Sequence, residues 1–174
     1  MNPSIDPAAF RQAMRRLAGG VGLITVGNGE DRTGLTATSV TSLSAEPPRL
    51  LVCINRNASA WPLLSEYRSF GVNLLDASQQ DLADRFAGRG GEKGPARFLG
   101  ARWKSLVTGA PLLEGALASF DCTVEEIIER HSHAIVIGRI EAVDLGDWSD
   151  PLLYWSGVYR TTRDLPAEPF AVAG

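Results

Sequence analysis

The sequence predicts a mainly β fold with peripheral helices, arranged as an antiparallel barrel or sandwich. Most apolar segments are short runs rich in Val, Ile, Thr and aromatic residues, and turns containing Gly, Asn or Pro separate them. Helical spacing is confined to three segments. The 174 residues, 44% of them hydrophobic and 21% charged, suit one domain with its own core. We therefore expect a single β-rich domain over residues 1–174.

The expected elements begin with a helix. Asp6 and Pro7 are suited to an N-cap and the first helical position, and Gly19-Gly20 would end the helix. Apolar residues recur between them at helical spacing: Phe10, Met14 and Leu17. Seven strands are expected after this helix, over residues 21–26, 35–43, 50–55, 70–75, 117–128, 134–143 and 152–159.

Two short helices and a loop interrupt these strands. The first helix covers 59–67, where Pro62 fits only in the first turn, and the second covers 78–87, with Ser78 and Asp81 as a capping-box variant. The glycine-rich loop 88–95 lacks the Gly-Lys-Ser/Thr of a P-loop, and no Gly-x-Gly-x-x-Gly follows a strand. Residues 163–174 are expected to form a C-terminal arm or tail.

Composition argues against several classes of partner. The net charge of −3 gives no electrostatic reason to expect nucleic acid or an anionic membrane. No apolar run approaches the roughly 20 residues that a membrane span needs. The first ten residues, MNPSIDPAAF, lack the layout of a secretory signal, so a cytoplasmic protein is expected. Cys53 and Cys122 lie in apolar runs, where free thiols are expected rather than a disulfide.

Conventional catalytic groups are sparse. His131 and His133 are the two histidines, and a zinc site would have to recruit scattered carboxylates, so no metal site is expected. The Gly-x-Ser-x-Gly elbow of a serine hydrolase is absent. A cofactor that carries its own chemistry fits such a chain better.

The segment GLTATSVTSLS, residues 34–44, is unusual because six of its eleven side chains carry hydroxyls. In one extended strand, Thr36, Thr38, Val40 and Ser42 would share a face, and neither face would be apolar. Two readings remain open: a solvent-facing strand, or a strand along which a polar ligand lies. Downstream, the run Asn55-Arg56-Asn57 and Ser59 adds donors and a positive charge where a phosphate could bind.

The chain resembles the short-chain flavin reductase family, the reductase partners of two-component flavin-dependent monooxygenases. The similarity lies in GLTATSVTSLSAEPPRLLVCINRNASAW (34–61) and, in order, in FRQAM (10–14), GVNLL (71–75), RFAG (85–88), HAIVIG (133–138) and PLLYWSGVY (151–159). It covers about residues 8–162. The resemblance implies an FMN-binding split β-barrel, usually a homodimer, that uses NADH or NADPH to reduce FMN or FAD. The reduced flavin would go to a partner monooxygenase.

The same resemblance implies a set of site residues. His133 corresponds to the family's histidine beside the nicotinamide, with Gly138 five residues later, although Arg130-His131-Ser132 departs from the family's small turn. Ser42, Ser44, Asn55 and Ser59 would contact the ribityl chain and phosphate. The expected flavin-binding residues are Thr36, Ala37, Thr38, Ser39, Val40, Ser42, Ser44, Cys53, Asn55, Ser59, Trp61, Arg85, Phe86, Ala87, Tyr154 and Tyr159.

Two alternatives to a flavin reductase stay open on the sequence. A pyridoxamine-phosphate-oxidase-like flavoenzyme would need a basic cluster that the sequence does not show around the motif, and a flavin-binding carrier or sensor would need no turnover. Trp61, Trp103 and Trp155 are expected mainly to pack in the core or at a dimer interface. The apolar segments 50–54 and 152–155 are expected on the exterior, which favours a homodimer that covers them.

Overall fold

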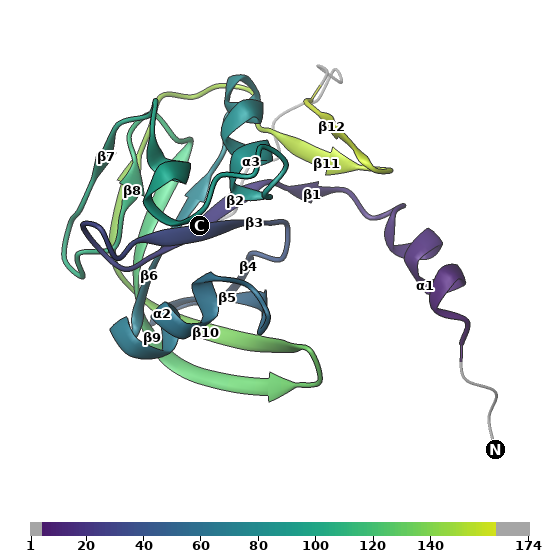
Figure 1. The fold of residues 1–174 in the computed structure, drawn as a ribbon, viewed down its shortest axis with the longest axis horizontal. Helices are drawn as coiled ribbons and strands as arrows, with labels where there is room; N and C mark the ends of the chain where they lie inside the picture. The colour runs from purple at the N-terminus through teal and green to yellow at the C-terminus, as the bar shows by residue number, and fades with distance from the viewer. Residues whose placement is uncertain (1–4, 163–174) are drawn as a thin grey trace.

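A seven-stranded antiparallel sheet forms the body of the protein in the computed structural model, which describes residues 5–162 (Figure 1). Its strand order is β3-β2-β6-β9-β10-β5-β4. In chain order the strands are β2 Gly22–Val26, β3 Thr33–Ala37, β4 Thr41–Ala45, β5 Pro48–Asn55, β6 Ser69–Leu74, β9 Ala118–Arg130 and β10 His133–Leu145. The expected arm or tail at 163–174 lies outside the described residues.

The sheet is curled into a split barrel. β3 and β4 occupy its opposite edges, yet only residues 38–40 join them. Because a chain advances at most about 3.6 Å per residue, the two edges must approach each other. Each edge strand pairs with one neighbour, β2 or β5. The barrel is therefore open along the seam between β3 and β4, and the expected antiparallel barrel is confirmed.

The longest strands, β9 and β10, form a hairpin whose register runs from the pair His133 and Arg130 to the pair Leu145 and Ala118. The register shifts between Ile137 and Gly138 and again between Ile140 and Ala142, as at β-bulges. A Cβ placed on Gly138 would lie 2.6 Å from Cζ of Phe70. Glycine at this position therefore lets the Phe70 ring pack directly against the bent strand.

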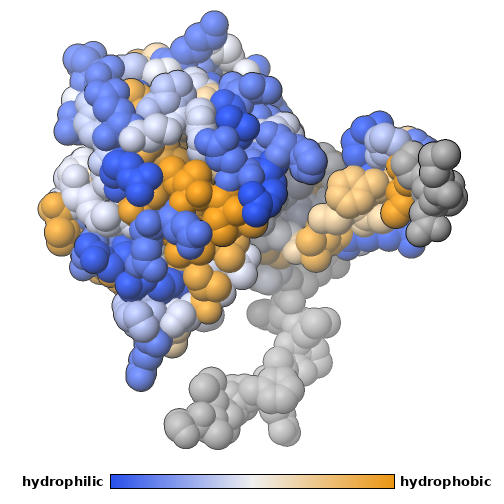
Figure 2. Space-filling view, turned by 90° about the horizontal axis from the view of Figure 1, so that it is seen from below, coloured by the Kyte–Doolittle hydropathy of each residue, from blue (hydrophilic) through white to orange (hydrophobic). Residues whose placement is uncertain are grey.

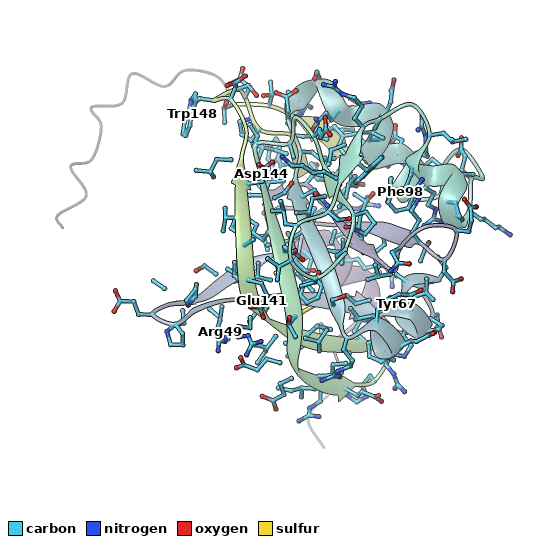
Figure 3. The ribbon with its side chains drawn as sticks, turned by 90° about the vertical axis from the view of Figure 1, so that its left-hand side faces the viewer. Arg49, Tyr67, Phe98, Glu141, Asp144 and Trp148 are labelled. Atoms are coloured by element: carbon cyan, nitrogen blue, oxygen red, sulfur yellow. The ribbon has the colours of Figure 1, made fainter. Side chains whose placement is uncertain are left out.

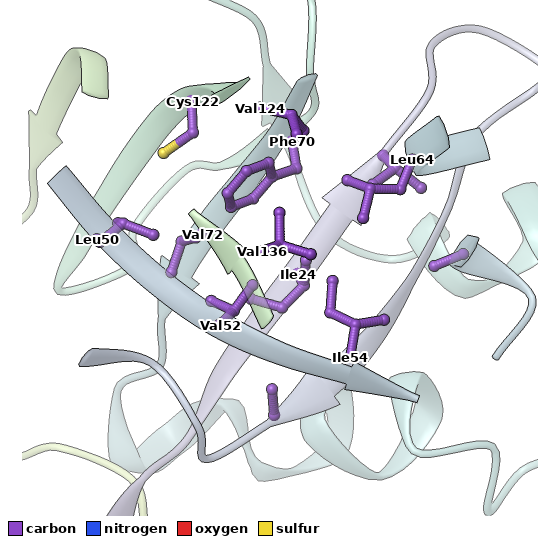
Figure 4. Packing of buried hydrophobic residues seen from close by; sticks show 13 residues of the cluster. Ile24, Leu50, Val52, Ile54, Leu64, Phe70, Val72, Cys122, Val124 and Val136 are labelled. Atoms are coloured by element: carbon purple, nitrogen blue, oxygen red, sulfur yellow. The ribbon is translucent and has the colours of Figure 1, made fainter. Parts of the chain in front are cut away.

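Two hydrophobic clusters form the core, and β2 contributes to both because its two faces are covered. Inside the barrel, Ile24 packs with side chains from β5, β6, β10 and α2, as Figure 4 shows: Val52, Ile54, Leu64, Phe70, Val72 and Val136. On the other side of β2, Leu23 packs with a second group: Val21, Leu75, Phe86, Phe98, Leu113 and Leu152. This double burial explains why β2 reads as a continuous apolar run.

The helices occupy the periphery: α1 Pro7–Met14, α2 Ala60–Tyr67, α3 Gln80–Phe86 and the short 3₁₀ helices η1 Ala77–Gln79 and η2 Gly94–Phe98. Asp6 caps α1 as expected, since its Oδ1 accepts from the Ala8 N–H at 3.0 Å. The expected capping box of Ser78 and Asp81 is wrong. Asp76 and Gln79 form it instead, because the helical segment begins earlier, with η1.

Two strands that the sequence predicts as continuous are broken. The predicted strand 35–43 ends at Ala37 and resumes at Thr41, because Ser39 Oγ both donates to the Cys53 carbonyl and accepts from its N–H. The predicted strand 152–159 is a hairpin of β11 Leu153–Trp155 and β12 Val158–Arg160. Ser156 and Gly157 have positive φ angles and make its turn.

The short strands flank the barrel. β1 Gly19–Gly20 pairs with β11, and β7 Trp103–Lys104 pairs with β8 Leu112–Leu113. The strands β1, β7 and β8 were not predicted from the sequence. The expectation of an apolar exterior at 50–54 is largely wrong, since Leu50, Val52 and Ile54 point into the barrel. In residues 5–162 we find no helix with the length and hydropathy of a membrane span.

Candidate functional site

A cavity of about 500 Å³ opens where β3, the 38–40 loop, β5, β10 and the ends of α2, α3 and η2 meet. It is lined by Leu35, Thr36, Ala37, Thr38, Ser39, Cys53, Asn55, Ala58, Ser59, Phe86, Ala87, Arg97 and His133. A larger groove of about 770 Å³ lies beside β4 and has a more apolar lining. We take the smaller cavity as the candidate site because it combines an apolar floor with several convergent polar groups.

The cavity gathers most of the residues that the resemblance implies. His133 and the residues Thr36, Ala37, Thr38, Ser39, Cys53, Asn55, Ser59, Phe86 and Ala87 line it together. Val40, Ser42 and Ser44 line the larger groove instead, because the chain turns at the 38–40 loop. A prediction based on one continuous strand could not separate these two groups.

The other expected site residues lie outside the cavity lining. Trp61 packs against the barrel core, and the Arg56 guanidinium lies over its ring. Arg85 donates to the Leu99 carbonyl. Tyr154 and Tyr159 pack edge to face, 5.4 Å apart between ring centroids. Burial, followed by the Asp84 carboxylate, raises the pKa of the Tyr159 phenol.

The hydroxyls of the opening segment have different roles. Thr36 Oγ1 donates to the Ala83 carbonyl at 2.6 Å and ties β3 to α3. Ser39 Oγ bridges both backbone groups of Cys53. Thr38 is exposed at the cavity. The hydroxyl-rich pattern therefore reflects both hydrogen bonds within the protein, to α3 and to β5, and groups available to a ligand.

One end of the cavity collects hydrogen-bond donors. Ser59 Oγ lies 3.4 Å from Thr33 Oγ1, and it makes no capping bond to α2 in the described chain. The side-chain oxygen of Asn55 accepts from the Asn57 N–H at 2.9 Å, so the Asn55 amide nitrogen stays available to donate. These groups suit a phosphate, as the sequence suggests.

The positive charge at the cavity comes from a residue that was not predicted from the sequence. Arg56 turns away to Glu129, with Nη2 2.7 Å from the carboxylate, and it is not among the lining residues. Arg97 lines the cavity instead. It is 42 positions beyond Asn55, and the signal that could have indicated it was a cation directly after the glycine-rich loop.

His133 is the first residue of β10 and is paired in register with Asn55 of β5. Its ring is exposed, and Nδ1 lies 2.9 Å from Ser132 Oγ. Cys53, also at the cavity, is partly buried and free, whereas Cys122 is buried elsewhere in the core. Burial, reinforced by Asp121, raises the pKa of the Cys122 thiol to about 12. Among residues 5–162, no group of three metal-ligating side chains occurs.

The composition of the cavity fits a flavin. Leu35, Ala37 and Phe86 supply apolar surface for a planar ring, while the Thr38 hydroxyl, the Asn55 amide and Ser59 are polar groups for a ring edge and a phosphorylated side chain. No strongly basic cluster of the kind needed by the oxidase alternative lines the cavity in the described chain. Among the described residues that line the cavity, Arg97 is the one with a permanent charge.

Comparisons with known proteins agree with this geometry. The sequence model of the family described as "Flavin reductase like domain" matches residues 14–163. FMN reductase (NADH) RutF 2 of Methylorubrum extorquens is 42% identical over 157 residues, which are 90% of this chain and 90% of the relative.

Solved structures give the same result. BorF, the flavin reductase component of a bacterial two-component tryptophan halogenase, has a TM-score of 0.83 and 37% identity over 92% of this chain and 100% of its own. A homologue of nitrilotriacetate monooxygenase component B from Mycobacterium thermoresistibile has a TM-score of 0.82 and 28% identity over 95% of this chain and 93% of its own. The chain therefore belongs to the flavin reductase-like domain family.

Proposed function

We propose that the protein reduces a free flavin, FMN or FAD, with a reduced nicotinamide nucleotide. The observation that carries this proposal is the cavity that brings Thr36–Ser39, Asn55, Ser59 and His133 together from four separate segments, in a member of the flavin reductase-like family. The relative from Methylorubrum extorquens is named an NADH-dependent FMN reductase, which favours NADH as the donor.

The protein's part in the reaction is to position two rings and keep water out. When bound, flavin accepts at its N5 a hydride from C4 of the nicotinamide, a step that needs little acid–base assistance. Leu35, Ala37 and Phe86 would support the flavin ring, and the 38–40 loop would contact its edge. Asn55 and Ser59 would hold its phosphate end.

His133 is suited to orient the nicotinamide. It is exposed at the cavity mouth, and its bond to Ser132 Oγ fixes one ring nitrogen. The other nitrogen can then face the carboxamide of the second substrate. We assign His133 to this positioning role.

We further propose that the reduced flavin passes to a flavin-dependent monooxygenase or halogenase. The structural relatives include the reductase component of a two-component tryptophan halogenase and a homologue of a monooxygenase component. A release role also agrees with the open cavity and with the single permanent charge among its described lining residues. Such a protein would act in the cytoplasm on small nucleotides, without nucleic acid or membrane.

We also propose that the protein forms a homodimer. The apolar residues of α1 and the turn after it, Phe10, Met14 and Leu17, are 59%, 47% and 66% exposed. Figure 1 shows α1 standing away from the barrel, and Figure 2 shows apolar surface on this projecting segment. A second copy would cover this surface.

The deciding experiment is an anaerobic assay of NADH oxidation with FMN or FAD in excess over protein. A reductase consumes one NADH per flavin and continues through many equivalents. A carrier or sensor would stop at one equivalent per subunit. A pyridoxamine-phosphate-oxidase-like enzyme would leave NADH unchanged and turn over a phosphorylated amine in the presence of oxygen.

A further inference from the structure

The glycine-rich loop 88–95 lies at the rim of the candidate cavity, and the residues on either side of it are fixed in the core. Phe86, just before the loop, and Phe98, just after it, are buried and pack edge to face with ring centroids 5.1 Å apart. Ala87 and Arg97 lie next to these two rings, and both line the cavity. The loop therefore leaves the core and re-enters it at nearly the same place, as an Ω-loop does, with the cavity beside it.

The loop itself stays outside the cavity in this structure. None of residues 88–95 is among the described residues that line it. Residues 88–91 are all exposed, and three glycines of the loop, Gly88, Gly91 and Gly94, have positive φ angles. Because glycine tolerates a wide range of backbone angles, the loop can swing about its fixed ends at little steric cost. It has the form of a lid in an open position.

Arg89 fixes the start of the loop in this open position. Its Nη1 lies 2.7 Å from the Asp84 carboxylate of α3, and its guanidinium carbon lies 5.4 Å from the centroid of the Tyr159 ring in β12. The backbone N–H of Arg89 also donates to the Asp84 carbonyl at 3.0 Å. Tyr159 is not among the described lining residues of the cavity, so these contacts hold the loop toward the β11–β12 hairpin.

We propose that loop 88–95 is a lid that closes over the bound flavin and nicotinamide rings, and that the contact of Arg89 with Asp84 and Tyr159 favours its open position. This inference rests on the proposed flavin reduction and adds to it a step that governs product release. Closure excludes water while the hydride is transferred, and reopening lets the reduced flavin leave. A contact made only in the open position shifts the equilibrium toward release.

The binding test uses Arg89→Gln, which removes both the ion pair with Asp84 and the contact with the Tyr159 ring. The Kd for FMN, measured by fluorescence titration, should fall about threefold to tenfold, because exposed ion pairs and cation–π contacts are individually modest. Dissociation of FMN in stopped flow should slow, since the lid is open for a smaller fraction of the time. Arg89→Lys, which keeps the charge and loses the planar guanidinium, should give a smaller change.

Steady-state and single-turnover rates separate product release from chemistry. In Arg89→Gln, kcat for NADH oxidation with FMN in excess should fall about threefold to tenfold, while the rate of flavin reduction in a single turnover should stay within about twofold of the wild-type rate. Lys93→Gln is the matched control, because it removes a positive charge from the same exposed loop and leaves the Arg89 contact in place. It separates lid opening from a general loss of attraction for the negatively charged FMN.

Two results would overturn the lid. One is a Kd for FMN in Arg89→Gln that equals or exceeds the Kd in Lys93→Gln, as expected where Arg89 only adds stability or attracts the flavin. The other is a single-turnover rate that falls as much as kcat, which would give Arg89 a part in the hydride transfer itself. Both leave flavin reduction by the wild type intact. Failure of the wild type to reduce any flavin would instead reject the proposed function, and the FMN titration does not depend on that reaction.

Discussion

Asn73 shows how single polar residues hold this barrel together. Its side chain is fully buried, and its amide nitrogen donates hydrogen bonds to the Leu23 carbonyl and to Thr25 Oγ1. Its oxygen accepts from the Leu113 N–H at 2.7 Å and from Ser119 Oγ at 2.9 Å. One amide therefore joins β2, β6, β8 and β9 at a place where no water can replace it.

Replacing Asn73 should therefore be costly. Asn73→Leu would leave the Leu23 carbonyl and the Leu113 N–H buried without these partners, and we expect a loss of about 2–4 kcal/mol in the free energy of unfolding. Urea unfolding followed by circular dichroism measures it. Glu126→Gln, an exposed change on β9, serves as the control. A loss below that of the control would mean that the network contributes no stability.

His133 should affect the reaction more than flavin binding. His133→Ala is expected to lower kcat by about tenfold to a hundredfold, because a positioning contact to the nicotinamide is lost. The Kd for FMN, measured by fluorescence titration, should move much less. The control is His131→Asn, since His131 occupies the exposed hairpin turn with φ 53°, which asparagine tolerates. Equal effects of both variants on kcat would assign His133 no special role.

Among the elements, the segment before α3 depends on one carboxylate. Asp76 Oδ1 accepts from the Ser78 N–H at 2.7 Å, and Oδ2 accepts from Ser149 Oγ in the loop after β10. The hydrogen bonds from Ser149 and Ser78 lower the pKa of Asp76. This cap thus fixes both the start of the helical segment and a loop 73 positions away.

The direction of the pKa shift of Asp76 predicts how its contribution to stability depends on pH. Because the folded state lowers the pKa of Asp76, its stabilisation is present above the ordinary aspartate pKa of about 3.9 and disappears as the pH falls through the lowered value. Asp76→Ala should therefore cost about 0.5–2 kcal/mol near pH 7 and less below pH 4. Thermal unfolding from pH 3 to 7 measures this. Asp81→Ala tests the wrongly predicted capping box and should cost less across the range.

At the scale of the whole molecule, some features could be predicted from the sequence pattern, and others depend on tertiary contacts. The apolar runs predicted the main strands because each lies in a buried sheet, and local residue types predicted the Asp6 cap. The break at 38–40 was not predictable, since it depends on a bond from Ser39 to the backbone of Cys53, which belongs to another strand. Arg97 was missed for the same reason: only the folded loop brings it to Gly34. The part of the site formed by one continuous segment can thus be recognised in the sequence. The part formed by residues from separate segments, which only folding brings together, cannot.

Two apolar surfaces within residues 5–162 bear on the proposed homodimer. One is α1 with the turn after it, and the other is the groove of about 770 Å³ beside β4, whose lining includes Val40, Phe120 and Val143. Figure 3 shows Arg49 and Glu141 side by side, and both line this groove. Glu141 is paired with Arg139, whose Nε lies 2.7 Å from its carboxylate, so apolar contact with Phe10 and Leu17 rather than charge would hold α1 in the groove. We infer that α1 of one copy lies in the groove of the other.

The proposed arrangement predicts how such a dimer could be separated without unfolding the barrel. Phe10→Ser with Leu17→Ser removes two exposed apolar side chains, each worth about 1.5–3 kcal/mol when buried, so the dissociation constant should rise by roughly 10²–10⁴-fold. Sedimentation at micromolar concentration should then show a monomer with an unchanged circular dichroism spectrum. Val143→Glu in the groove should have the same effect. Trp148→Ser alters a fully exposed tryptophan that Figure 3 places apart from Arg49 and Glu141, and it should leave the dimer intact. If Trp148→Ser separates the subunits and the α1 variant does not, the interface lies on the Trp148 side of the molecule.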